Sequence, residues 1–180
     1  MTTIHGMGDP SGVSDPVQPP YVVLGATGIL APLSSLLPAD RKRLGIARGS
    51  SPIRGAWDEV VLFDGHDGGA VASFVARLEP GYAVVAYAPT VTPATWEALC
   101  RKAARRVLVL TSAYAAPGVA IDEWLTAGEV TTCILGWTGP AGAPRWHTPE
   151  EISQVAWSAL LAEPGSHLTL GRVRPWTQRP

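Results

Sequence analysis

The stretch "YVVLGATGIL", residues 21–30, decides how the rest of the chain is interpreted. Its apolar start is typical of a buried strand, and the glycines that follow predict a turn that opens a helix. In such a turn Gly25 permits the tight bend, Gly28 lets the backbone approach a phosphate, and Ala31 lets the helix pack closely on the strand. The pattern therefore predicts a dinucleotide site, and a plain strand-to-helix turn is the alternative. The residues expected to hold the pyrophosphate are Gly25, Thr27, Gly28 and Ile29.

Short apolar runs and helical patterns alternate along the remaining chain. Several of the runs are continuous, as in strands that are buried on both faces of a sheet. The predicted strands are 21–24, 44–47, 60–63, 83–86, 107–110, 132–135 and 167–170, and the predicted helices include 71–78, 96–103 and 149–160. This alternation predicts a single α/β domain over residues 21–180 with a doubly wound, mostly parallel sheet. The second crossover, 48–58, is too short and too rich in proline and glycine for a normal helix, so we expect a loop there.

Composition excludes several classes of function. The 14 basic and 15 acidic side chains nearly balance, which argues against a nucleic-acid partner or binding to an anionic membrane. No apolar run is long enough to span a membrane, and the N-terminus lacks the apolar core of a signal peptide, so we expect a cytoplasmic protein. We interpret residues 1–20 as a flexible tail and Cys100 and Cys133 as buried free thiols, and we expect no metal site.

The residue after the second strand normally reads the ribose of the adenosine. An acid there favours NAD, but this chain has Arg48 and Ser50, which suit the 2′-phosphate of NADP. We therefore predict NADP in preference to NAD. Asp64, which follows the third strand, is expected to accept a hydrogen bond from the adenine amine, and an ordinary loop aspartate is the alternative.

Several motifs together resemble the short-chain dehydrogenase/reductase superfamily, particularly its extended and atypical branches. They are "GATGILA" (25–31), a strand-ending Asp64, "AVVAYAP" (83–89) and "RVLVLTSAYA" (106–115), in the superfamily's order. The segments "APRWHTPEEIS" (143–153) and "GRVRPWTQRP" (171–180) look like those of unusually small bacterial members. The resemblance implies a Rossmann-like fold, with Ala88 beside the cofactor ribose.

The resemblance also implies a catalytic set of serine, tyrosine and lysine, in which tyrosine donates a proton while hydride arrives from nicotinamide. Ser112 matches the serine position. A Tyr-x-x-x-Lys motif should follow about a dozen residues later, but the segment 120–130 contains neither residue. Tyr114 and Tyr87 are the remaining candidates for a proton donor.

Substrates of doubly wound sheets bind beyond the carboxyl ends of the strands. There we expect Trp137 and Trp146 to form an aromatic pocket, with core packing as the alternative for both. Arg145 and His147 are the best polar pair for an anionic substrate or for acid–base work, and a solvent-exposed His147 is the alternative.

Three functions remain open. The first is an NADP-dependent oxidoreductase that acts on a small molecule with a non-standard proton donor, for which an imine or a conjugated double bond needs less help than a ketone. The second is a dinucleotide-binding protein without turnover. The third is a non-redox enzyme that carries out isomerisation, cyclisation or elimination. Trp157 and Leu161 lie beside the core face of the last long helix, and we expect a homodimer.

Overall fold

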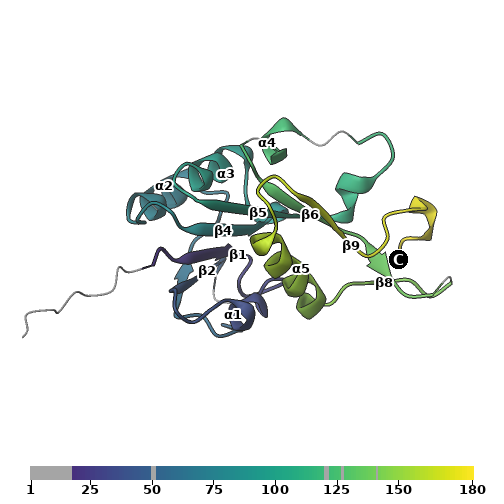
Figure 1. Ribbon diagram of the computed structural model, residues 1–180, viewed down its shortest axis with the longest axis horizontal. Helices are drawn as coiled ribbons and strands as arrows, with labels where there is room; N and C mark the ends of the chain where they lie inside the picture. The colour runs from purple at the N-terminus through teal and green to yellow at the C-terminus, as the bar shows by residue number, and fades with distance from the viewer. Residues whose placement is uncertain (1–17, 50–51, 120–121, 127, 141) are drawn as a thin grey trace, which may run out of the picture.

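A seven-stranded parallel sheet forms the centre of the molecule, with the strand order β3-β2-β1-β4-β5-β6-β9 (Figure 1). The computed structural model describes residues 18–49, 52–119, 122–126, 128–140 and 142–180, so most of the predicted tail lies outside it. The strands are β1 (Tyr21–Leu24), β2 (Arg43–Ala47), β3 (Glu59–Leu62), β4 (Ala83–Tyr87), β5 (Arg105–Leu110), β6 (Thr131–Leu135) and β9 (His167–Leu170). Each predicted run corresponds to one of these strands, and the doubly wound α/β fold is confirmed.

Helices cover both faces of the sheet (Figure 1). On one face lie α2 (Gly68–Ala76), α3 (Pro93–Cys100) and α4 (Glu123–Thr126), and on the other lie α1 (Leu33–Leu36) and α5 (Pro149–Leu161). Alternate side chains of β1 divide between the two layers: Val22 and Leu24 belong to the first core, and Tyr21 and Val23 to the second. Burial on both faces explains why the strand sequences are continuously apolar.

The helix that follows the glycine turn is short and begins late. Residues 25–32 form consecutive turns, in which the Gly28 amide donates to the Gly25 carbonyl (3.1 Å) and the Ala31 amide donates to the Gly28 carbonyl (3.1 Å). The regular helix α1 starts at Leu33 and has four residues. Two glycines and Pro32 explain this delay, because both residue types disfavour α-helix. The loop therefore presents separate backbone amides rather than the end of a long helix dipole.

The second crossover contains no helix among its described residues, as predicted, and a tryptophan fills the space instead. The Trp57 indole nitrogen donates to the Ala26 carbonyl of the glycine turn at 3.1 Å. Its ring packs against Gly45 of β2, where a Cβ would lie 2.9 Å from Trp57 Cδ2 and 2.9 Å from Ala26 Cβ. Further along, the Ser34 hydroxyl accepts a hydrogen bond from the Ala56 amide (2.7 Å). The crossover is thus fastened to the underside of the glycine turn.

Two short strands, β7 (Trp137–Thr138) and β8 (Arg145–Trp146), form a separate antiparallel pair beyond the end of β6. Two residues are too few to give a periodic signal, and the sequence did not predict them. The C-terminal segment returns to this pair, because the Arg172 amide donates to the Trp137 carbonyl at 2.8 Å. None of the described helices has the length and apolar character needed to cross a membrane. Leu161, on the surface predicted to form a homodimer, is 67% exposed; the dimer stays a prediction.

The contact between Gly45 and Trp57 predicts a cost for any side chain at position 45. We expect Gly45→Ala to lower the free energy of unfolding by about 1–3 kcal/mol, because neither Ala26 nor the indole ring can move aside easily. Urea denaturation measures the free energy of unfolding of both variants. Gly68→Ala is the matched control, since a Cβ at Gly68 would meet open space. Equal stability of the two variants would contradict this role for Trp57.

Candidate functional site

Two cavities lie at the carboxyl ends of the central strands, where β1 is flanked by β2 on one side and β4 on the other. This is the point at which the strand order reverses, and it is where doubly wound sheets bind ligands. The cavities share Ile29, from the glycine turn, and Tyr87, from the end of β4. The two cavities therefore adjoin one another, with these two side chains at their boundary.

The first cavity has a volume of about 270 Å³ and lies against the glycine turn. Its lining residues are Leu24, Gly25, Thr27, Gly28, Ile29, Ile46, Ala47, Arg48, Phe63, Gly65, Tyr87 and Thr90. Gly25 has φ +97°, which side chains other than glycine rarely adopt, and it starts the bend. A Cβ on Gly28 would meet only the Gly25 carbonyl, at 3.8 Å, so the surface of the loop is open.

Unused backbone donors remain in this loop. The amides of Gly25 and Ala26 both donate to the Ile46 carbonyl at 3.3 Å, which ties the turn to β2. Within the part of the chain that the structure describes, the amides of Thr27 and Ile29 have no backbone partner. Both residues line the first cavity. Open amides of this kind are what a phosphate group requires.

The other residues predicted for the cofactor separate into three groups. Arg48 lines the first cavity, so it is placed to contact a ligand there. Ala88 is buried at the start of the 3₁₀ turn Ala88–Thr90 and lines neither cavity, and its place beside the ribose stays a prediction. Ser50 lies outside the described residues.

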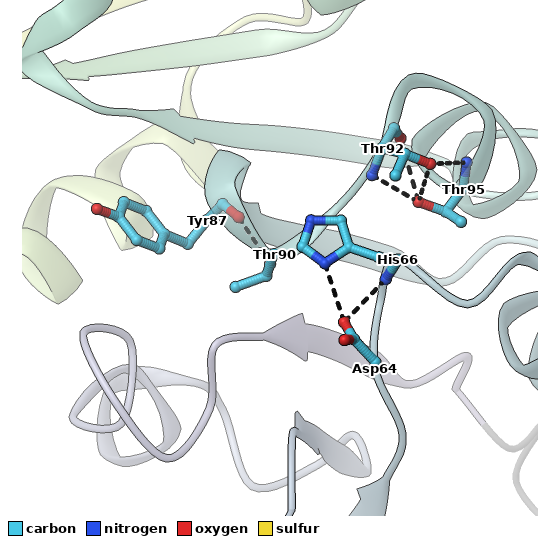
Figure 2. A network of polar contacts seen from close by, with 6 residues as sticks. All are labelled: Asp64, His66, Tyr87, Thr90, Thr92 and Thr95. Carbon is cyan, nitrogen blue, oxygen red and sulfur yellow. Dashed lines mark hydrogen bonds and ion pairs between the residues drawn. The ribbon is translucent and has the colours of Figure 1, made fainter.

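The carboxylate of Asp64 is held by contacts with His66 in its own loop (Figure 2). Its Oδ1 accepts the His66 backbone amide at 3.0 Å and lies 3.0 Å from His66 Nδ1. The amide hydrogen bond, more than the imidazole contact, lowers the pKa of Asp64 below its ordinary value. The carboxylate is therefore held beside the first cavity without lining it.

The second cavity has a volume of about 230 Å³ and extends from β4 to the N-terminal end of α5. Its lining residues are Ile29, Tyr87, Thr111, Ser112, Leu135, Gly136, Trp146, His147 and Ile152. Three of these carry hydroxyl groups, on Tyr87, Thr111 and Ser112. The sequence predicted Tyr87, Ser112, Trp146 and His147 for this place, and the fold brings all four together.

Tyr87 occupies the boundary between the cavities. Its carbonyl accepts the Thr90 hydroxyl at 2.6 Å, and its ring points away from the Asp64–His66 pair (Figure 2). Burial raises the pKa of Tyr87 above its ordinary value, so the side chain stays a neutral phenol at neutral pH. Tyr114, the other candidate donor, lines neither cavity and packs against the core layer that α2, α3 and α4 cover.

Glu151 binds both Arg145 and His147, the polar pair that the sequence predicted for the substrate site. Its carboxylate forms two 2.8 Å hydrogen bonds with Arg145, lies 3.1 Å from His147 Nδ1 and accepts the Thr148 amide at 2.9 Å. The guanidinium of Arg145, first among these partners, holds the pKa of Glu151 well below its usual range. The guanidinium of Arg145 is paired with Glu151, and Arg145 does not line the cavity.

His147 is buried rather than solvent-exposed, with a side chain that is 6% accessible. Its Nε2 has no hydrogen-bond partner among the described residues and faces Gly171, where a Cβ would come within 2.2 Å. Nδ1 is paired with the Glu151 carboxylate and Nε2 is buried next to Gly171, so neither nitrogen is exposed to a substrate for proton transfer. The pairing with Glu151 therefore gives no support to the anion site that Arg145 and His147 were predicted to form, and that site stays a prediction.

The two tryptophans that were predicted to form an aromatic pocket lie in different environments. Trp146 lines the second cavity and is 46% exposed. Trp137 is completely buried and lies behind it, with the two rings perpendicular and their centroids 6.5 Å apart. Core packing, the alternative for both residues, holds for Trp137 alone.

Sequence reasoning missed several lining residues. Thr111 adjoins Ser112 at the end of β5, and that adjacency was the signal available. Glu151 lies three residues after Thr148, and this spacing, typical of the capping box that the structure contains, was the signal available. Gly65 also lines the first cavity, and a Cβ there would lie 2.1 Å from the Thr90 carbonyl oxygen. This close approach of distant segments requires glycine, and no local pattern reveals it. Across the described residues, no group of histidine, cysteine and acidic side chains is arranged to hold a metal ion.

Comparison with known proteins supports the fold. No protein-family profile and no curated protein sequence matches the chain. ChuY, an anaerobillin reductase from Escherichia coli, is 14% identical with a TM-score of 0.54 over 87% of this chain and 97% of its own. A Rossmann-fold NAD(P)-binding family protein from Shigella flexneri is 13% identical with a TM-score of 0.55, over 85% and 92%. A short-chain dehydrogenase family protein from Francisella tularensis is 10% identical with a TM-score of 0.56, over 86% and 97%. At these identities the likeness shows a shared fold.

The depressed pKa of Glu151 predicts how pH affects its contribution to stability. A carboxyl group with a lowered folded-state pKa stabilises the fold above its unfolded-state pKa, and this contribution is lost as pH falls toward the folded-state pKa. We expect Glu151→Gln to lower the melting temperature at pH 7, and this deficit to shrink as the pH falls below about 4.5. Glu150→Gln, in the same first turn of α5, is the control. A deficit that does not vary with pH would contradict the assignment.

Proposed function

We propose that this protein is a reductase that binds a nicotinamide dinucleotide, NADP(H) in preference to NAD(H), and reduces a small molecule. One observation carries the proposal: two adjoining cavities at the reversal of strand order share Ile29 and Tyr87. The first adjoins open amides and an arginine, and the second contains three hydroxyl groups. A molecule with a charged phosphate portion and an uncharged reacting ring would place its phosphates in the first cavity and its ring in the second. The reductase activity of ChuY, which shares the fold, agrees with this class.

The residues of the first cavity fit a dinucleotide. The amides of Thr27 and Ile29 are the donors for the pyrophosphate, and the absence of a side chain on Gly28 leaves room for it. Arg48 supplies the cation for a 2′-phosphate at the end of β2. Charge-assisted hydrogen bonds of arginine to phosphate are stronger than neutral ones, which favours NADP over NAD.

In the second cavity, the chain's own residues orient a substrate and supply a proton. A bound nicotinamide would supply hydride to the substrate there. The hydroxyls of Thr111 and Ser112 bind the substrate's oxygen or nitrogen, and Tyr87 donates the proton from its phenol. Among the described residues, no lysine or arginine lines this cavity to lower the pKa of Tyr87. A phenol with a raised pKa is a weak acid, so the suitable substrates are polarised double bonds.

A second candidate is a dinucleotide-binding protein without turnover. The observation that favours it is the isolation of Tyr87, since among the described residues its hydroxyl has no hydrogen-bond partner that would promote proton transfer. NADPH binding without oxidation by any substrate would support this candidate over the reductase.

The role of Arg48 predicts a selective loss of affinity. We expect Arg48→Ala to weaken NADPH binding roughly tenfold and to leave NADH binding nearly unchanged, because only NADPH carries the 2′-phosphate. Titration followed by fluorescence of the reduced nicotinamide measures both constants. Arg54→Ala, an exposed arginine on the same crossover, is the control. Equal losses for the two cofactors would remove Arg48 from the ribose site.

The role of Tyr87 predicts a loss of turnover without a loss of binding. We expect Tyr87→Phe to reduce kcat roughly a hundredfold, as expected when a positioned proton donor is removed, with an unchanged Kd for NADPH. Substrate-dependent NADPH oxidation with 1,4-naphthoquinone and cinnamaldehyde is the assay. Wild-type activity should stay level through neutral pH and fall only above the ordinary tyrosine value of 10.0. Tyr114→Phe is the matched control, and a larger effect there would reverse the assignment.

A further inference from the structure

We infer that the second cavity takes an uncharged, flat, conjugated molecule that stacks on Trp146, rather than an anionic one. This inference rests on the proposed function for its biological meaning, because the second cavity is the substrate site there. Its physical argument uses only the charges, hydroxyl groups and aromatic rings that line the cavity.

The lining of the second cavity has no permanent charge. His147 is the one titratable basic residue among its lining residues, with Nδ1 on Glu151 and Nε2 buried against Gly171. The nearby cation, Arg145, forms two 2.8 Å hydrogen bonds with Glu151 and stands outside the lining. A carboxylate or phosphate entering this cavity would lose water without gaining a cationic partner, which is costly.

Trp146 provides a fixed aromatic surface at the cavity. It lines the cavity and is 46% exposed, so its indole is accessible to a ligand there. Its position is set from behind by Trp137, which is fully buried and also lies edge-on to Trp176 with ring centroids 6.1 Å apart. A ring supported in this way loses little side-chain entropy when a flat ligand stacks on it.

The remaining polar groups suit an uncharged ligand. Within the described chain, the side-chain hydroxyls of Thr111 and Ser112 donate no hydrogen bond, and neither does that of Tyr87. Hydroxyl groups are neutral donors that match a carbonyl or imine. Ile29, Leu135 and Ile152 add apolar surface to the lining of the same cavity. An indole together with three hydroxyl groups therefore favours a conjugated carbonyl compound over an ion.

A pair of isosteric probes tests this directly. Isothermal titration of the full-length protein alone with 2-naphthamide and with 2-naphthoate compares a neutral and an anionic form of the same ring. We expect 2-naphthamide to bind at least roughly tenfold more tightly at pH 7. Equal or tighter binding of 2-naphthoate, or no saturable binding of 2-naphthamide, would overturn the inference.

Variants at Trp146 locate the binding. We expect Trp146→Ala to weaken 2-naphthamide binding roughly tenfold and Trp146→Phe to retain it within about threefold, because phenylalanine preserves a stacking surface. Trp124→Ala, in the separate groove between α3 and α4, should have no effect. Unchanged affinity in Trp146→Ala, with normal circular dichroism, would refute stacking. Because no cofactor is present, these results are independent of NADPH binding, whose failure would instead refute the proposed function.

Discussion

The contact of Trp57 with the glycine turn is the interaction on which the site depends. The second crossover has no helix among its described residues to support the turn, and the indole takes that role by bonding the Ala26 carbonyl and packing on Gly45. Such a contact requires a glycine in β2, because any side chain there would occupy the space of the ring. With the turn fixed from below, the amides of Thr27 and Ile29 remain free to face the first cavity.

Charge is distributed unevenly around the two cavities, and this asymmetry gives the site its chemical character. Near the second cavity, Arg145 is neutralised by Glu151, and at the base of the crossover Arg43 is neutralised by Asp58, whose pKa falls to about 2. Arg48 lines the first cavity, and its charge also acts on the nearby carboxylate of Asp64. One cavity thus offers a cation and backbone donors, and the other offers hydroxyls and an indole. A dinucleotide with a neutral co-substrate would use both.

The parts of the fold that were predictable have signals that are local in the chain. Continuous apolar runs identified the seven strands of the sheet, and capping boxes at Thr92 and Thr148 mark the starts of α3 and α5. The glycine turn was predicted to open a helix, and that helix is only four residues long, since turns closed by Gly25 and Gly28 compete with it. In the site, Arg48 and Ser112, which come just after β2 and β5, line the cavities, whereas Asp64 and Ala88, just after β3 and β4, do not. The burial of Trp137 and the pairing of Arg145 depend on contacts that strand position does not predict.

By itself, the sequence determined the layered architecture and the position of the glycine turn, because periodic burial and turn chemistry depend on neighbouring residues alone. Only the tertiary structure decided that Tyr87, and not Tyr114, reaches the cavities, since both follow strands and differ in which layer their rings enter. It also decided that Glu151 pairs with Arg145. Pairing of charges and the choice between core and cavity depend on three-dimensional distances, which residue order does not encode directly.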